Sequence, residues 1–505
     1  MKLPRNLILI SQCICFLGIL LFGRTTTSAQ VSAGMQLPQL TEFLASNDSI
    51  LSDEDGDFSD WIEISNPNAF DMDIGGYYLT DDLTDLIKWA FPAGTTLAAN
   101  SSLVVFASGK DRDGPEYHTN FGLSASGEDL ALVAPNGVTI VSSFAAYGEQ
   151  FEDISFGTGA SGVGFFSPPT PGAENGDVFI DFVADTAFDV DRGFYDTPFT
   201  VTISSETLGS TIIYTVDGTE PTLTNGTAVS AASPSTPGAA MVTISKTTVL
   251  RAAAFKDDFF PTNVDTQTYL FTADILQQNE MDPDVVNSPL YASEMDAALK
   301  SIRTLSIVTD PDNLFDSDIG ILENTQGRGE EWERPVSIEF FKDGVPDDAF
   351  QADAGIRVFG NGSRGSAKNS LRLIFRGEYG PTRLEYPLFG EDWVTTFNTV
   401  VLRAQNANSW THGRAEDRNG ATYLQDAFAR DLQTEMGRPT TGATFVHLFL
   451  NGEYWGLYNP VERPDGAFGE EHFGGDEEDY DSLNRRFDVE AVSYTHLTLP
   501  TIYSV

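Results

Sequence analysis

Short, closely spaced β-type runs of hydrophobic residues dominate the first half of the chain. Within residues 37–160 these runs are 61–64, 76–79, 102–107, 129–134 and 138–144. Within residues 183–272 they are 199–205, 210–218, 246–255 and 266–271. Short β-type runs broken by Asn, Pro and Gly are typical of antiparallel β-sandwiches. The pattern therefore predicts two sandwiches, separated by the Pro- and Gly-rich linker 161–182.

The pattern changes after a second linker, residues 273–299. Residues 300–490 combine β-type runs with one helical period, from Ala421 to Met436. On one face of that helix the spacing places Leu424, Ala427, Phe428, Leu432 and Met436. Two strands, 443–450 and 453–459, follow and are joined by Asn451-Gly452, a strong hairpin signal. The third segment is therefore predicted to be an α+β domain, and the whole chain multidomain and mostly β.

The first 29 residues have the features of a secretory signal peptide. Lys2 and Arg5 precede an apolar run, Leu7 to Phe22, and small residues end at Ala29. We expect cleavage there and a bacterial protein that is secreted or held at the cell surface. An uncleaved anchor is the alternative, because the run is at the short limit of what spans a bilayer. Both cysteines lie in this segment, so cleavage would leave no thiolate metal site and no disulfide.

The charge of the chain excludes some partners. Seventy-four Asp and Glu against 29 Lys and Arg give a formal charge of −45. Phosphate backbones and anionic membrane surfaces are gripped by clustered cations, which this composition does not supply. We therefore expect no nucleic-acid partner, and no membrane association after signal cleavage.

The last fifteen residues differ from the rest. Residues 491–505 contain no charged residue in a chain that is 20% charged. Their sequence resembles the translation of an adapter used in shotgun sequencing libraries. We expect the natural sequence to stop near Glu490, within a domain, and the tail to be non-native. A native β-like C-terminal strand is the alternative.

The first predicted sandwich resembles the lamin-tail domain (LTD), on the motifs at 42–47, 57–66 and 75–81. That family has an immunoglobulin-like fold and serves recognition or scaffolding. Inside it, Asp53, Asp55 and Asp57 alternate as the ligands of a calcium loop do. A solvated acidic turn is the competing interpretation. Trp61, in the next strand, is predicted to be a core residue.

The second sandwich, through residues 212–221 and 248–252, resembles the small module appended to chitobiases and hexosaminidases. That module has a fibronectin-III-like (Fn3-like) fold. The resemblance implies a spacer, with carbohydrate contact as the alternative.

The third segment resembles the spore-coat-protein-H (CotH) kinase family. The matching motifs, in order, lie at 305–315, 332–339, 355–364, 402–404 and 449–458. The family has a protein-kinase-like fold and transfers a phosphoryl group from ATP to protein serines. The resemblance therefore implies ATP and Mg²⁺ as cofactors and a protein substrate. Sheet, helix, two strands and the linker 461–465 also follow the order of a kinase small lobe up to its hinge.

A glycine-containing segment between two β-type runs has the features of a phosphate-binding loop. Residues 360–365 fit GxGxxG, in which Gly360 and Gly362 let backbone N–H groups approach phosphate oxygens. Arg364 and Lys368 add positive charge that phosphoryl transfer needs. A plain hairpin turn is the alternative. By position in the linker, Glu462 is predicted to lie at the adenine edge.

Two acids on the predicted helix, Asp426 and Glu435, are candidates to form an ion pair with Lys368. The alternative is that these acids lie on a solvated face of the helix.

The catalytic residues themselves are not identified. A kinase places its base and metal ligands after the hinge, where we expect the sequence to be truncated. The chain is therefore interpreted as an inactive fragment of an exported CotH-type kinase. The alternative is a non-catalytic adhesion or scaffold protein that binds a cell-surface or extracellular-matrix partner through a degenerate kinase-like domain.

Overall fold

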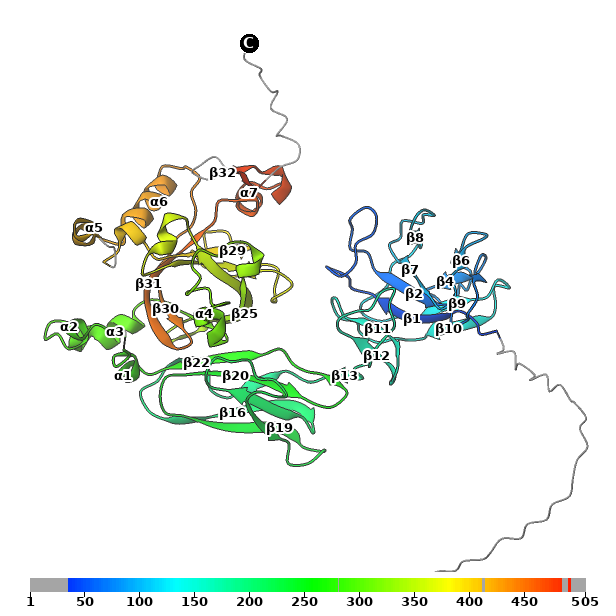
Figure 1. The fold of residues 1–505 in the computed structure, drawn as a ribbon, viewed down its shortest axis with the longest axis horizontal. Helices are drawn as coiled ribbons and strands as arrows, with labels where there is room; N and C mark the ends of the chain where they lie inside the picture. Colours follow the sequence, from blue (N-terminus) through cyan, green and yellow to red (C-terminus); the bar gives the residue numbers. More distant parts are fainter. Residues whose placement is uncertain (1–34, 280, 411–413, 484–488, 492–505) are drawn as a thin grey trace, which may run out of the picture. The chain divides into compact units, whose positions relative to one another are not determined.

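The computed structural model describes residues 35–279, 281–410, 414–483 and 489–491 (Figure 1). The predicted signal segment 1–29 and residues 492–505 lie outside this part. No described helix is both long and apolar enough to cross a bilayer. The described chain is mostly β, as the sequence predicts. It forms two compact units, one of residues 35–40, 62–122 and 127–148, the other of the remainder.

The first compact unit is built from short strands whose hydrophobic residues are buried. One sheet has the order β10-β9-β4-β5, and other neighbours are β2-β7-β8 and β3-β6. The bounds are β2 Trp61–Ser65, β3 Met72–Asp73, β4 Tyr78–Thr80, β5 Trp89–Ala90, β6 Thr96–Leu97, β7 Ser102–Phe106, β8 Tyr117–His118, β9 Leu130–Val133 and β10 Ile140–Phe144. Ile62, Leu79, Val105 and Leu132 are completely buried, and β2 and β9 bury residues on both faces. Trp61 is also completely buried, so its assignment to the core is confirmed.

The second compact unit begins with three strands in the order β12-β11-β1 and continues as a sandwich. Its two sheets have the orders β14-β16-β19 and β15-β22-β20-β17-β18, beside a parallel pair, β13-β21. The bounds are β1 Gln39–Leu44, β11 Ser155–Gly159, β12 Gly162–Phe166, β13 Asp181–Phe182, β14 Thr186–Phe188, β15 Gly193–Phe194, β16 Phe199–Leu208, β17 Thr211–Thr215, β18 Thr227–Ser230, β19 Pro237–Ile244, β20 Thr248–Phe255, β21 Phe259–Phe260 and β22 Asp265–Leu270. In β19 buried and exposed residues alternate strictly, so one face is in the core and the other in water.

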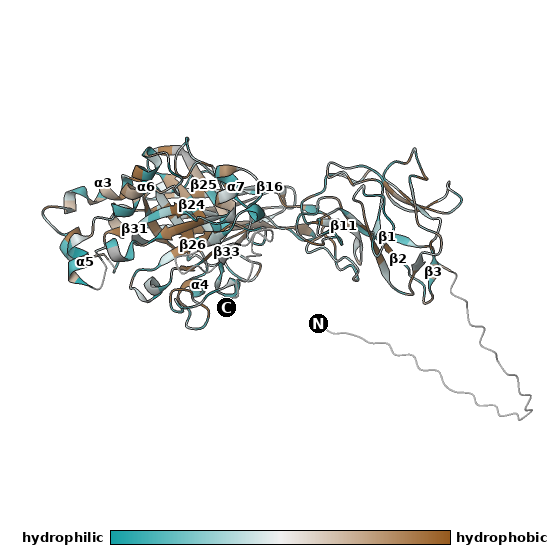
Figure 2. Cartoon of the chain, turned by 90° about the horizontal axis from the view of Figure 1, so that it is seen from above, coloured by the Kyte–Doolittle hydropathy of each residue, from teal (hydrophilic) through white to brown (hydrophobic). Residues whose placement is uncertain are grey.

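Short helices follow the sandwich and lead into a closed seven-stranded barrel. The helices are α1 Thr272–Ile275, α2 Pro283–Val286 and α3 Met295–Lys300. The barrel has the order β23-β24-β25-β26-β29-β31-β30. Its strands are β23 Thr304–Val308, β24 Arg334–Lys342, β25 Val345–Phe359, β26 Ser370–Ile374, β29 Thr399–Arg403, β30 Val446–Leu450 and β31 Glu453–Glu462. Parallel pairing of β23 with β30 closes it, and hydrophobic residues are concentrated in β24–β26 (Figure 2).

Smaller elements decorate the barrel. They are α4 Pro311–Phe315, β27 Leu384–Glu385, β28 Thr396–Phe397, α5 Ala415–Gly420, α6 Gln425–Glu435, α7 Gly466–Phe473, β32 Ser482–Leu483 and β33 Val489–Ala491. The predicted helix is confirmed as α6, but none of its residues is buried. Phe428 is 67% exposed and Met436 64%, so the predicted apolar face is not part of the barrel core.

Sandwich and barrel share buried contacts inside the second unit. Glu339 of β24 is completely buried and accepts hydrogen bonds from the backbone and hydroxyl of Thr268 in β22. Arg192 lies 3.5 Å from its carboxylate. Burial raises the pKa of Glu339, although Arg192 and Thr268 act against this. Leu270 and Phe341 belong to one hydrophobic cluster that spans both parts.

Candidate functional site

A cavity of about 290 Å³ lies where several barrel strands end. The loop after β25 contributes Gly360 and Ser363, the end of β29 contributes Arg403, and α6 contributes Arg430. Glu462, the last residue of β31, and Arg463 after it form another wall. The remaining lining residues are Phe359, Ser370, Val401, Gln405, Asn406, Val461 and Pro464. We call this the strand-end cavity. Of the five predicted nucleotide-binding residues, two line it, Gly360 and Glu462.

Gly360 allows the chain to turn sharply after β25. Its φ is +118°, and a Cβ atom there would lie 2.3 Å from the Ser363 hydroxyl oxygen. Only glycine adopts this conformation without strain. The loop that follows contains Gly362 in a single 3-10 turn, Gly362–Gly365, with open space around the position of a Cβ. The sequence pattern therefore marks a turn whose backbone borders the cavity.

Arg364 turns back into the protein. It is 5% exposed and donates to four backbone carbonyl oxygens: Nε to Gly360, Nη1 to Thr325 and Gly327, and Nη2 to Val358, at 2.6–2.8 Å. Burial lowers its pKa, and nearby arginines add to this effect. Because its donors are used inside the chain, Arg364 holds the loop in shape, and it does not line the strand-end cavity.

Lys368 lies on the same loop but outside the cavity lining. Its Nζ donates to the Leu457 carbonyl oxygen at 2.7 Å and lies 4.4 Å from the centroid of the Tyr458 ring. Burial lowers its pKa to about 8. The carboxylate of Asp426 pairs with Arg403 instead, as described next. The suggested Asp426–Lys368 pair is therefore wrong.

Asp426 joins the strand and the helix at the cavity wall. Its Oδ2 lies 2.5 Å from Arg403 Nη1 and 3.0 Å from Arg430 Nε, one turn further along α6. Burial acts to raise the pKa of Asp426, but the two guanidinium groups outweigh it and hold the pKa below its usual value. One carboxylate therefore positions two cations, and their combined charge exceeds its own.

Glu462 lines the cavity, but its carboxylate is fully engaged with its own chain. It is 5% exposed. Oε2 accepts from Trp393 Nε1 at 2.7 Å and from the Gly442 backbone N–H at 2.5 Å, while Oε1 faces His472 Nε2 at 2.8 Å. These contacts fix the segment that follows β31. Glu462 therefore shapes one wall of the cavity and leaves no carboxylate oxygen unbonded.

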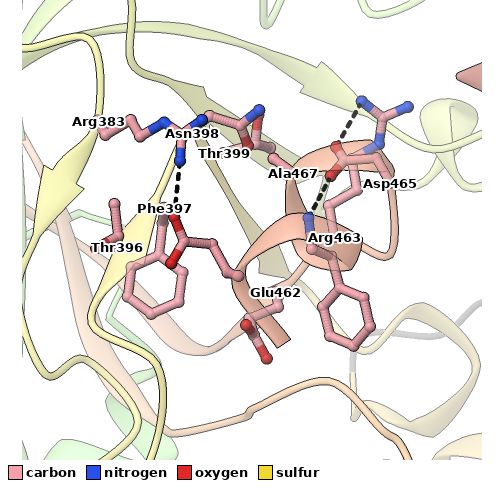
Figure 3. A pocket seen from close by; sticks show the side chains of 11 residues that line it. Arg383, Thr396, Phe397, Asn398, Thr399, Glu462, Arg463, Asp465 and Ala467 are labelled. Carbon is pink, nitrogen blue, oxygen red and sulfur yellow. Dashed lines mark hydrogen bonds and ion pairs between the residues drawn. The ribbon is translucent and has the colours of Figure 1, made fainter. Parts of the chain in front are cut away.

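A smaller cavity adjoins the same segment (Figure 3). Arg463 Nη1 lies 3.6 Å from Asp465 Oδ2 there. Asp465 also accepts from the Phe468 backbone N–H and so caps α7. Behind it, burial and the neighbouring Arg463 and Arg357 lower the pKa of Arg372 to about 9. Cations are therefore crowded at this end of the barrel although the chain as a whole is strongly acidic.

The donor groups of the strand-end cavity suit an anion and not magnesium. Mg²⁺ is held by carboxylates that retain free oxygens. The acids near the cavity, Asp426 and Glu462, are already bonded to arginine, tryptophan, backbone and histidine groups. Glu462 has both oxygens bonded, and Asp426 shares its Oδ2 between two arginines, so within the described residues the cavity offers guanidinium donors that can hold an anion.

The three predicted calcium ligands lie together in the loop before β2. Ligand oxygens of Asp53, Asp55 and Asp57 are all within 4.8 Å of one another. Asp53 is 5% exposed, and its carboxylate accepts from the backbone N–H groups of Asp55 and Asp57 and from the Ser59 hydroxyl. These bonds organise the turn without an ion. Calcium binding here stays a prediction.

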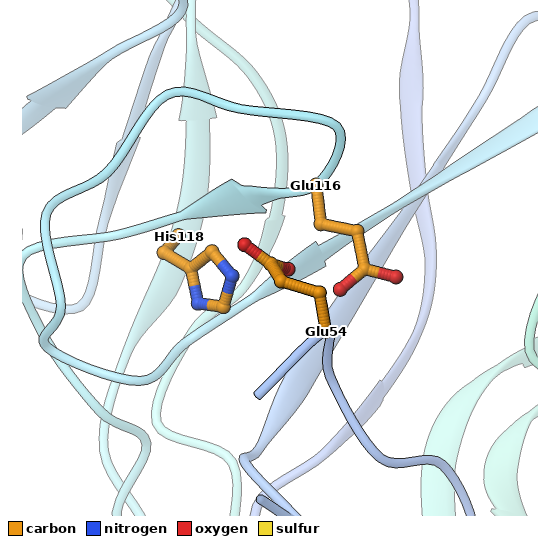
Figure 4. Close-up of side chains that lie close together, drawn as sticks. All are labelled: Glu54, Glu116 and His118. Atoms are coloured by element: carbon orange, nitrogen blue, oxygen red, sulfur yellow. The ribbon is translucent and has the colours of Figure 1, made fainter. Parts of the chain in front are cut away.

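His118 and Glu116 of the first compact unit are drawn in Figure 4. His118 is completely buried and stacks on Phe106, with the ring centroids 5.4 Å apart. Nδ1 lies 2.9 Å from the Ser108 hydroxyl and Nε2 lies 3.2 Å from Arg112 Nη2. A guanidinium at Nε2 competes with a metal cation for the same lone pair, so we assign no metal to His118.

The sequence-based reasoning missed Arg403 and Arg430 as site residues. The signal for Arg430 was its spacing of four from Asp426 on a helix, which brings the two side chains together. Nothing local signals Arg403, because its contact with Asp426 joins a strand to a helix 23 residues away.

Comparisons with known proteins now add family relationships. Residues 356–495 match the CotH kinase protein family, residues 45–148 the Lamin Tail Domain, and residues 190–266 the chitobiase/beta-hexosaminidase C-terminal domain. All three predicted resemblances are thereby confirmed.

No curated protein matches the chain. Among solved structures, the extracellular domain of the one-component system BT4673 from B. thetaiotaomicron is 11% identical with a TM-score of 0.15. That match covers 45% of this chain and 30% of the other, and a likeness this low supports no conclusion about fold or function.

Proposed function

We propose that residues 300–490 bind the phosphates of a nucleotide in the strand-end cavity, as the small lobe of a CotH-type protein kinase. The observation that carries the proposal is the placement of Arg403, Arg430 and Arg463 around one cavity in a chain of charge −45. Guanidinium groups match the geometry of phosphate oxygens and stay charged at neutral pH.

The arrangement of elements supports the same proposal. Strand neighbours β25-β26-β29-β31-β30, with α6 between β29 and β30 in sequence, surround the cavity. The loop from Gly360 to Asn369 joins β25 to β26 as the Gly-rich loop of a kinase joins two strands. Asp426 of α6 pairs with Arg403 of the neighbouring strand, as a helix acid pairs with a strand cation in protein kinases. ATP would therefore enter with its phosphates toward the arginines.

Nucleotide binding is proposed without phosphoryl transfer by the described residues. Transfer needs a carboxylate that orients the attacking hydroxyl and ligands for magnesium. The carboxylates of Asp426 and Glu462 are both engaged. We also propose that the protein acts outside the cytoplasm on a protein partner, which rests on the sequence of residues 1–29 and on the families matched.

Calorimetric titration of the full chain with ATP tests the nucleotide site. We expect ATP to bind. Adenosine, which lacks the phosphates, should bind at least tenfold more weakly. Arg403→Met and Arg430→Met should each weaken ATP binding by about tenfold, because each removes a charge-assisted contact of about 1.5 kcal/mol.

Arg438→Met is the matched control, since Arg438 is exposed just after the same helix. Its affinity for ATP should equal that of the parent. Equal affinities for adenosine and ATP, or no ATP binding, would favour the alternative, a non-catalytic scaffold with a degenerate kinase-like domain.

A further inference from the structure

Two cavities between the second sandwich and the barrel form a cleft that shares no residue with the strand-end cavity. The larger is about 640 Å³ and the smaller about 420 Å³. Asn263 and Asp353 line both, so the two cavities adjoin. We call the pair the sandwich–barrel cleft. It lies within the second compact unit, on the side of the sandwich where β22 faces the barrel (Figure 1).

Carboxylates outnumber cations in the sandwich–barrel cleft. They are Glu220, Asp310 and Glu378 in the smaller cavity, Asp185, Asp191 and Asp265 in the larger one, and Asp353 in both. Considering all residues that the structure describes, none of these carboxylates forms an ion pair. The cleft therefore has an excess of negative charge, because only two arginines, Arg192 and Arg251, line it with these carboxylates.

The two arginines of the cleft are committed to other partners. Arg192 lies against the buried Glu339 and donates to the Phe350 carbonyl oxygen at 2.8 Å. Arg251 is 9% exposed and donates from Nη1 to the Gly218 carbonyl oxygen at 3.1 Å. Arg192 acts on Asp265 and Arg251 on Asp353, but two cations offset only part of the charge of the cleft carboxylates.

A buried amide is left incompletely bonded at the same place. Gln267 lines the larger cavity and is 9% exposed. Its Oε1 accepts from the Arg192 backbone N–H at 2.8 Å, whereas its amide NH₂ has no partner among the described residues. In the smaller cavity, Nε of Arg251 is likewise unpartnered. Buried donors are nearly always bonded, so the buried Nε of Arg251 points to an acceptor that comes from outside the chain, and the accessible NH₂ of Gln267 is a second free donor.

Retaining these carboxylates costs stability. Burial raises the pKa of Asp265 to about 6, against the opposing effect of the Thr186 hydroxyl. Burial also raises the pKa of Asp353. Arg192 and Arg251 oppose this effect only in part, and carboxylates whose desolvation is not fully compensated destabilise the fold and are concentrated at binding sites.

We propose that the sandwich–barrel cleft binds a lysine- or arginine-bearing segment of a partner polypeptide. The cationic side chains pair with Asp265 and Asp353, and a peptide carbonyl accepts from the unbonded NH₂ of Gln267. Phe188 and Pro381 in the larger cavity offer apolar surface to the side-chain stems. Two adjoining cavities suit an extended segment with several cations better than one small ion. The proposal does not depend on nucleotide binding.

Fluorescence anisotropy with the full chain tests this proposal. The probe is a labelled peptide in which lysine alternates with glycine, and the reference is the same peptide with glutamate in place of lysine. We expect only the lysine peptide to bind, with an affinity that falls steeply between 0.05 and about 0.5 M salt. Asp353→Asn and Asp265→Asn should each weaken binding at least tenfold.

Glu206→Gln is the control, because Glu206 is exposed on β16 of the same sandwich and lines neither cavity. It should bind the lysine peptide within twofold of the parent. Equal losses in Glu206→Gln and Asp353→Asn would show binding to general negative charge and overturn the proposal. So would tighter binding of spermidine than of the peptide, or no peptide binding at millimolar concentration.

Discussion

At the residue scale, several charged side chains form hydrogen bonds inside the protein instead of facing solvent. Arg364 spans four carbonyl oxygens, and Glu462 collects three donors. Sequence alone shows the charge but not its partners, because each partner comes from a distant segment. This explains why Arg364 looked like a phosphate ligand and is found holding the loop. Gly360 and Glu462 could be predicted to line the site, since a turn after one strand and a linker after another are local features.

Replacing Arg364 should loosen the loop before β26. Arg364→Met removes four hydrogen bonds from a charged donor, and we expect about 3 kcal/mol of lost stability in urea unfolding. Arg364→Lys keeps the charge but cannot reach four carbonyls, so it should lose nearly as much. Full stability in the lysine variant would contradict the assigned role, because charge alone would then suffice.

The pKa of Asp265 makes a prediction about pH. An acid whose folded pKa lies above its unfolded value destabilises the fold above the folded pKa, and the penalty fades as the pH falls toward the unfolded value of 3.8. Asp265→Asn should therefore be more stable than the parent at pH 7.5, and this advantage should shrink to about a third at pH 4.5. Urea midpoints at both pH values check this, with Glu206→Gln as the unchanged reference. A destabilised Asp265→Asn at pH 7.5 would be inconsistent with the cost assigned to this carboxylate.

At the element scale, local patterns predicted the strands and the helix α6, but they did not predict what surrounds α6. The runs at 61–64, 102–107 and 199–205 all became strands, because a run of β-type residues is a local property. The barrel closure was not predictable, since it pairs Thr304 with His447 far along the chain. The sequence predicted an apolar face on α6, and in the structure no residue of the helix is buried. Periodicity shows that a face exists but not what covers it.

Exposure of α6 leads to a stability prediction. Phe428→Ser and Leu432→Ser should each change the free energy of unfolding by no more than about 0.5 kcal/mol, as for other exposed positions. Leu448→Ser, in the barrel core and completely buried, should cost more than about 2 kcal/mol. Large losses in both α6 variants would mean that the face is covered in solution.

At the scale of the whole molecule, the second sandwich and the barrel form one structural body. Thr268 and Glu339 bond across them, and Leu270, Phe341 and Phe449 share a cluster. A sandwich read from the sequence as a spacer is therefore part of the support of the barrel. The sequence could not show this, because these contacts join residues of the sandwich to residues of the barrel that are far away in the chain.

We expect the sandwich and the barrel to unfold together. Phe341→Ala should lower the stability of both by about 3 kcal/mol. Limited proteolysis with mass spectrometry should then show fragments from residues 183–272 and 300–490 appearing at the same rate. Faster cleavage of the barrel alone would show that the shared cluster does not couple them.

The most direct measurement for the central proposal is a crystal structure of the full chain with a non-hydrolysable ATP analogue. The account predicts density for the phosphates in the strand-end cavity, in contact with Arg403 and Arg430, and adenine near residues 461–465. Density for the analogue elsewhere, or none at saturating concentration, would contradict it.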